Sequence, residues 1–220
     1  AHGWEGRGAQ LGDFVPALVE AGYSAVTWDA PAHGDSPGRT SSLVEFADAI
    51  WSAGRAAGDI HSIIAHSMGA AAAGMALDEG MPAERAVFIS PPHGMETYFD
   101  RFAQLLGLSP SVYQRMIHSM EKRYHVRLDE LSFEAMEGRQ DQPLLVIHDE
   151  QDREVPVELG RRVARDWPGA ELRTTTDLGH RRILRDPAVI RQAVRFLHQP
   201  TPSTPAPKTP KPASRQPVTT

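Results

Sequence analysis

One serine in this chain, Ser67, stands in a context that would make its hydroxyl a nucleophile. It is the centre of residues 65–69, Ala-His-Ser-Met-Gly, which follow a largely apolar run at 60–64 and precede a run of small residues at 70–77. This order predicts a strand, a sharp turn and a helix, with the serine exposed at the turn and small neighbours that let strand and helix approach closely. A serine hydroxyl also needs a base within hydrogen-bond reach before it can attack.

Candidates for that base and for an acid that orients it come later in the chain. The apolar residues 144–147 precede Asp149 and Asp152, and a second predicted strand at 171–176 precedes His180. The histidine would take the proton from the serine, and either carboxylate would hold the imidazole tautomer. This order of serine, acid and histidine differs from that of the chymotrypsin and subtilisin triads.

The elements that must position these residues alternate along the chain. Apolar residues at helical spacing predict helices at 11–21, 157–167 and 187–197, and Ser42 with Glu45 has the spacing of a capping box at the start of another. Strands are predicted at 24–28, 60–65, 85–90, 144–147 and 171–176. Strands that alternate with helices predict an α/β fold, a mostly parallel sheet with helices on both faces.

Several motifs together resemble those of the α/β-hydrolase family, over residues 2–198. The similar motifs are His2-Gly3-Trp4, the Asp-x-x-Ala-His-Gly-x-Ser turn at 29–36, the spacing of Asp152 to Val155-Pro156, and Leu178-Gly179-His180. The family has glycine at two positions where this chain has Ala32 and Ala65. The resemblance implies the α/β-hydrolase fold.

The resemblance also implies which residues form the catalytic site. They are Ser67 as nucleophile, His180 as base and Asp152 as the acid, which is preferred to Asp149 because Val155-Pro156 follows it at the family's spacing. An oxyanion hole is expected from the backbone N–H groups of Met68 and of Gly3 or Trp4.

Residues 93–140 interrupt the alternation, because they contain apolar stripes at helical spacing and no strand-like run. The family commonly inserts a helical cap at this point, so the resemblance implies a cap over the nucleophile. The expected organisation is one α/β-hydrolase domain at 1–199 and a disordered tail, rich in proline and threonine, at 200–220. The family's first three strands would precede Ala1, so we expect an N-terminally incomplete sheet that folds poorly as this segment alone.

Other histidines near these motifs are expected to have structural roles. His66 adjoins the candidate nucleophile, and packing beside the turn is the simpler interpretation. His33 is expected to hold the family's turn after its fourth strand. His93 and His148 lie on loops at the pocket side, and contact with substrate is left open for both.

The composition excludes several other classes of protein. The net charge of -5 gives no sign of nucleic-acid binding, and the absence of cysteine excludes disulfides and a cysteine nucleophile. No apolar run approaches the roughly 20 residues that span a bilayer, and no His, Asp and Glu residues have zinc-like spacing. We expect a small-molecule substrate, no cofactor and no metal, and the oligomeric state is left open. The expected location is the cytoplasm, with a signal peptide left open.

The leading hypothesis for function is a serine hydrolase that cleaves a small or medium carboxylic ester through an acyl-enzyme. Haloalkane dehalogenases and epoxide hydrolases share the fold but have aspartate at the position of Ser67. Peptidases, thioesterases and carbon–carbon bond hydrolases keep the serine and stay open as alternatives, as does a non-catalytic member that binds a ligand or partner. Methionine and phenylalanine in the expected cap favour an adaptable apolar pocket.

Overall fold

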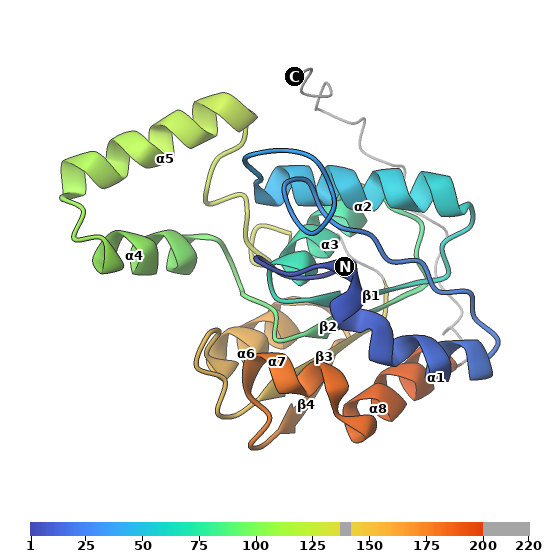
Figure 1. Ribbon diagram of the computed structural model, residues 1–220. Coiled ribbons are helices and arrows are strands. Elements are labelled where there is room, and N and C mark those ends of the chain that lie inside the picture. Colours follow the sequence, from blue (N-terminus) through green and yellow to red (C-terminus); the bar gives the residue numbers. More distant parts are fainter. Residues whose placement is uncertain (137–141, 200–220) are drawn as a thin grey trace.

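A four-stranded parallel sheet lies at the centre of the computed structural model, which describes residues 1–136 and 142–199 (Figure 1). The strands are neighbours in chain order: β1 (Ser62–His66), β2 (Arg85–Ile89), β3 (Leu144–Asp149) and β4 (Glu171–Thr175). Phe88 of β2 is opposite Ala65 of β1 and Val146 of β3. Because all the strands are parallel, the loops that leave their carboxyl ends meet at one edge of the sheet.

Helices cover both faces of this sheet, as the alternating pattern predicts. One face carries α2 (Leu43–Ala57), α3 (Met68–Asp78) and α6 (Val157–Asp166). The other face carries the 3-10 helices η1 (Gly8–Phe14) and η2 (Ile183–Arg185), together with α1 (Val15–Glu20) and α8 (Pro187–Leu197). The predicted α/β fold is confirmed.

The central strands are buried along their whole length because both faces are covered. Every residue of β2 and β3 is buried. Successive side chains point to opposite faces of a strand, so Ala86 and Phe88 enter the core beneath α2 and α3, while Val87 and Ile89 enter the core beneath α8. The loops that follow these strands therefore start from fixed positions.

Residues 96–124 contain two helices that stand apart from the sheet (Figure 1). α4 (Glu96–Leu105) and α5 (Pro110–Tyr124) follow β2 and extend away from the sheet and its covering helices (Figure 1). The segment is fixed at its base, where the Phe133 N–H donates to the His93 carbonyl at 2.9 Å. The end of the expected cap, at 137–140, and the expected tail at 200–220 lie outside the described residues.

The strand predicted at 24–28 is wrong. Residues 23–30 have no regular secondary structure, and Val26 is 59% exposed. A β-branched or aromatic sequence becomes a strand only where a neighbouring strand supplies backbone partners and packing. Within the described residues, the edge of β1 away from β2 is contacted by Ala1, whose carbonyl accepts from the His66 N–H at 3.0 Å.

The starts of two helices follow from the local sequence. Ser42 caps α2, and its side chain accepts from the Glu45 N–H at 3.2 Å, as the capping-box spacing predicts. The single helix predicted at 11–21 is instead split into η1 and α1. Pro16 lies in the first turn of α1, where its missing N–H is harmless, whereas inside one continuous helix it would remove a hydrogen bond.

Candidate active site

Ser67 lies on a strained turn between β1 and α3. Its φ of 53° and ψ of -127° are angles that a residue with a side chain rarely adopts. The Ser67 N–H donates to the Ile89 carbonyl at 2.9 Å, which ties the turn to the end of β2. The predicted strand, turn and helix around this serine are therefore present.

Residues 2–4 cross directly beside the Ser67 turn. A Cβ on Gly3 would lie 2.8 Å from the Ser67 Cβ, and a Cβ on Gly69 would collide with the His2 carbonyl oxygen. Glycine is required at both positions because the two backbones approach so closely. This contact brings the first residues of the chain to the candidate nucleophile.

Backbone amides beside the serine are available as donors. Met68 is the first residue of α3, so its N–H has no acceptor within the helix. In the part of the chain that the structure describes, neither the Met68 nor the Trp4 N–H donates a hydrogen bond. The N-terminus of α3 also carries the positive end of the helix dipole, which favours a negative charge nearby.

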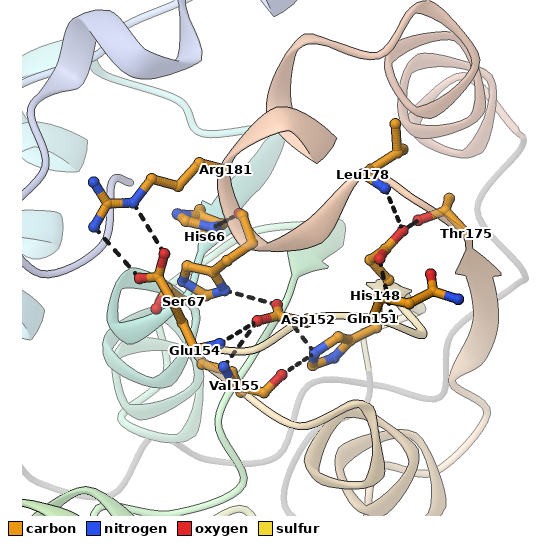
Figure 2. Close-up of polar contacts among 12 residues, drawn as sticks. His66, Ser67, His148, Gln151, Asp152, Glu154, Val155, Thr175, Leu178 and Arg181 are labelled. Atoms are coloured by element: carbon orange, nitrogen blue, oxygen red, sulfur yellow. Dashed lines mark hydrogen bonds and ion pairs between the residues drawn. The ribbon is translucent and has the colours of Figure 1, made fainter.

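Asp152 holds the ring of His180. The His180 Nδ1 lies 2.7 Å from Asp152 Oδ2, and the backbone N–H groups of Glu154 and Val155 donate to Oδ1 at 2.9 Å each (Figure 2). Burial alone would raise the pKa of Asp152, but hydrogen bonds from His148 and His180 outweigh it and hold that pKa well below its usual range. An ionised carboxylate only accepts, so Nδ1 of His180 carries the proton and Nε2 has a free lone pair.

Asp149 does not contact the imidazole. It accepts from the Thr175 hydroxyl at 2.8 Å, from the Leu178 N–H at 3.0 Å and from the Gln151 N–H at 3.0 Å. Burial would raise the pKa of Asp149, but the backbone N–H of Gly179 together with these donors lowers it. Asp149 thus fastens the loop after β3 to the loop after β4, which carries His180.

His148 also contacts Asp152, a position that the sequence left unassigned. Its Nε2 lies 2.9 Å from the Val155 carbonyl and 3.5 Å from Asp152 Oδ2, and the residue is fully buried (Figure 2). A carbonyl can only accept, so Nε2 carries the proton. The sequence signal was the position of His148 four residues before Asp152, which does not by itself predict a contact.

His66 is structural, as expected, but its partner is the candidate base. Its Nε2 donates to the His180 carbonyl at 2.9 Å, and the two rings lie 4.5 Å apart. Burial, followed by the charge of His180, lowers the pKa of His66 to about 3. A neutral imidazole therefore supports the backbone of His180 across neutral pH.

The two other histidines lie elsewhere. His33 Nδ1 donates to the Pro31 carbonyl at 2.9 Å, and its ring packs edge-on against Trp4 and Phe46, which fits the expected structural role. His93 Nε2 lies 2.6 Å from Asp166 Oδ2 and joins the base of the α4–α5 segment to α6. Neither lines the cleft that contains Ser67.

Ser67 and His180 line one cleft of about 370 Å³. In the part of the chain that the structure describes, no hydrogen bond joins the Ser67 and His180 side chains. Hydrogen bonds between catalytic groups are often long before substrate binds and tighten in the complex. The Tyr98 hydroxyl, from α4, is 3.4 Å from the Ser67 Oγ. Among the described residues, Tyr98 is the one residue of α4 and α5 that lines this cleft, so the expected Met- and Phe-lined pocket is not found here.

The described residues contain neither a metal-binding cluster nor a membrane-spanning helix. No three His, Asp or Glu side chains there are grouped closely enough to hold a metal ion. Of the helices described, none combines the length and apolar character needed to cross a bilayer.

Comparisons with known proteins agree with this architecture. Residues 1–193 match the profile described as the alpha/beta hydrolase family. A monoacylglycerol lipase from Paleococcus ferrophilus has a similar structure, with a TM-score of 0.68, 20% identity and coverage of 90% of this chain and 91% of the lipase. A bromoperoxidase from Bacillus anthracis has a TM-score of 0.68 at 18% identity, covering 89% of each chain.

A third similar structure is an esterase from Pyrococcus furiosus, with a TM-score of 0.63, 22% identity and coverage of 89% of this chain and 79% of the esterase. At these identities the structural likeness concerns the fold. No curated protein matches the sequence. Because the family profile covers most of the chain, the protein belongs to the α/β-hydrolase family.

Proposed function

We propose that this protein is a serine hydrolase that cleaves a small or medium carboxylic ester through an acyl-enzyme, with a triad of Ser67, Asp152 and His180. The observation that carries the proposal is the 2.7 Å contact of Asp152 with His180 Nδ1, which leaves Nε2 free in the cleft that Ser67 lines. A serine on a strained turn, a histidine base and a buried carboxylate are the three parts that acyl transfer needs.

Acylation would begin with attack of the Ser67 Oγ on the ester carbonyl carbon while His180 Nε2 takes the hydroxyl proton. The negative charge that develops on the carbonyl oxygen would be stabilised by the N–H groups of Met68 and of Gly3 or Trp4. Collapse of the tetrahedral intermediate breaks the bond to the leaving alkoxide, to which His180 returns the proton. An alcohol leaves and the acyl group stays on Ser67.

Deacylation would repeat these steps with water as the nucleophile. His180 Nε2 takes a proton from water, the hydroxide adds to the acyl carbon, and the bond to the Ser67 Oγ breaks as the proton returns to it. Asp152 stays ionised throughout and stabilises the imidazolium that forms twice in the cycle.

The choice of esters is supported by two of the structures similar to this chain, which are named a monoacylglycerol lipase and an esterase. Cleavage of a peptide, a thioester or a carbon–carbon bond would use the same residues and is the alternative within the fold. The α4–α5 segment is proposed to act as the cap, since it contributes Tyr98 to the cleft.

The test is covalent labelling of the full chain with a fluorophosphonate, followed by an ester assay. We expect the wild type to be labelled and both Ser67→Ala and His180→Ala to lose labelling and turnover, because removing a triad member lowers kcat by about 10⁴-fold or more. Ser52→Ala, on the exposed side of α2, is the matched control and should keep both. A folded wild type that is neither labelled nor active on esters would contradict the proposal.

A further inference from the structure

Three arginines follow the candidate base directly and line the same cleft. Arg181 and Arg182 belong to α7 (Gly179–Arg182), and Arg185 ends η2. His180 also belongs to α7, so the imidazole and the three arginines are all carried by residues 180–185. Their guanidinium groups therefore lie at the rim of the cleft in which an ester would react.

The arginines differ in how far their charges are already balanced. Arg181 forms a two-pronged pair with Glu154, with N···O distances of 3.1 and 3.4 Å (Figure 2). Arg185 has only a loose contact with Asp13, at 4.0 Å between exposed side chains. Such an exposed, long pair contributes little and leaves the guanidinium available.

Arg182 is held without a carboxylate. Its Nε donates to the Leu178 carbonyl at 3.1 Å and its Nη2 to the Asp177 carbonyl at 2.6 Å. Among the described residues no Asp or Glu side chain forms an ion pair with it. Its position is thus fixed by the backbone while its charge is not neutralised, which is a preorganised cationic group.

The sign of the charge at this rim is opposite to that of the molecule. The chain has a net charge of -5, whereas the cleft has three arginines against two glutamates, Glu5 and Glu154. The apolar and aromatic side chains of its lining include Trp4, Tyr98 and Leu184. An anionic group in this cleft would find guanidinium donors that match a carboxylate.

We propose that the ester which this cleft accepts carries a second, free carboxylate, held by Arg182 and Arg185. The inference rests on the proposed hydrolase function and specifies its substrate class: a short ester with one ionised carboxylate on either the acyl or the alcohol side. Arg181 stays paired with Glu154.

The experiment compares charged and neutral esters of matched size with the full chain. The first pair is 4-acetoxybenzoate and 4-acetoxybenzamide, with the charge on the leaving side. The second pair is monomethyl adipate and methyl hexanoate, with the charge on the acyl side. Each kcat/KM is divided by the rate of alkaline hydrolysis of the same ester, so the ratio within a pair reports recognition of the charge.

We expect the wild type to prefer the charged ester of at least one pair, and the preference to fall about two- to fivefold in Arg182→Gln and in Arg185→Gln. Arg182→Lys should keep most of the preference for the charged ester, because lysine keeps the positive charge. This variant therefore separates the effect of the charge from the effect of Arg182 on the loop that carries His180. Arg191→Gln, exposed on α8, is the control and should leave both ratios unchanged. High salt should weaken the preference in the wild type.

Other outcomes separate this inference from the proposed function. Neutral esters cleaved as well as charged ones, or ratios that do not respond to either glutamine variant, would overturn the substrate class and leave the hydrolase intact. If Ser67 is labelled but no ester is turned over, the test becomes protection of Ser67 from the fluorophosphonate. Adipate should then protect Ser67 from labelling, whereas hexane-1,6-diol should not. Failure of labelling itself would overturn the function, and the inference with it.

Discussion

At the scale of residues, the end of β3 and the loop after it carry two buried carboxylates with different partners, Asp149 and Asp152. Asp152 accepts a hydrogen bond from the His180 ring. Asp149 instead accepts hydrogen bonds from the Thr175 hydroxyl at the end of β4 and from the Leu178 N–H in the loop that follows. Both have a lowered pKa, because hydrogen-bond donors outweigh burial in each case. One carboxylate orients the imidazole and the other positions the loop that carries it.

The two carboxylates should therefore respond differently to loss of charge. Asp152→Asn should lower kcat by about 10⁴-fold, because an amide at this position no longer fixes the imidazole tautomer that carries its proton on Nδ1. Steady-state kinetics on any ester that the wild type cleaves would measure this loss.

Asp149→Asn should mainly affect stability. The free energy of unfolding should decrease by about 2 kcal/mol, the typical contribution of hydrogen bonds to a charged group. Urea denaturation measures the change, and kcat should fall far less than in Asp152→Asn. Equal losses of kcat in two well-folded variants would contradict the separate roles.

At the scale of elements, α6 packs closely on the end of β3 because it has a glycine there. A Cβ on Gly160 would collide with the Nδ1 of His148, the residue whose other nitrogen lies beside Asp152. The ring of His148 thus connects the packing of this helix on the sheet to Asp152, the acid of the proposed triad. A glycine inside a helix is otherwise unfavourable by about 1 kcal/mol relative to alanine.

Gly160→Ala should destabilise the protein although it raises helix propensity. We expect a loss of about 1–3 kcal/mol from overpacking, together with a lower kcat as His148 and Asp152 shift. Thermal unfolding and steady-state kinetics would show both effects. Gly12→Ala is the control, since a Cβ there meets nothing within 4 Å. A Gly160→Ala variant as stable and active as the wild type would show that α6 can move away without consequence.

At the scale of the whole molecule, the site joins segments from both ends of the described chain. Residues 2–4 lie against the Ser67 turn, and His66 supports His180, which is 114 residues away in sequence. His66 stays neutral in the folded protein because burial lowers its pKa to about 3. An unfolded histidine instead takes up its proton near pH 6.5.

This difference couples stability to pH. Between pH 6.5 and about 3 the unfolded chain binds one more proton than the folded one at His66, so stability is full above pH 6.5 and falls as the pH is lowered. From pH 7 to pH 5 the wild type should lose about 2 kcal/mol more than His66→Gln, which keeps a donor and has no titrating ring. Urea denaturation at the two pH values measures this difference.

His118→Gln, exposed on α5, serves as the control for the pH series and should follow the wild type. A wild type whose stability declines no faster than that of His66→Gln would contradict the burial of a neutral imidazole.

Much of the framework could be predicted from the sequence, because it depends on neighbours along the chain. Apolar runs predicted β1, β2 and β3 to within a few residues, and the strand predicted at 171–176 corresponds to β4. The small residues around Ser67 predicted the turn that links β1 to α3. The strand predicted at 24–28 failed because a strand exists only where another segment pairs with it. That pairing is not a property of the segment itself.

The sequence by itself determined the parallel α/β fold, the turn that holds Ser67 and the loops that carry the acid and the histidine. Only the tertiary structure decided that Asp152 meets the His180 ring, that His66 and His148 support the pair, and that arginines rather than methionines line the cleft. The physical reason is distance along the chain. Periodicity and turn chemistry act over a few residues, whereas these contacts join loops that meet only because the order and register of the strands bring their ends to one edge of the sheet.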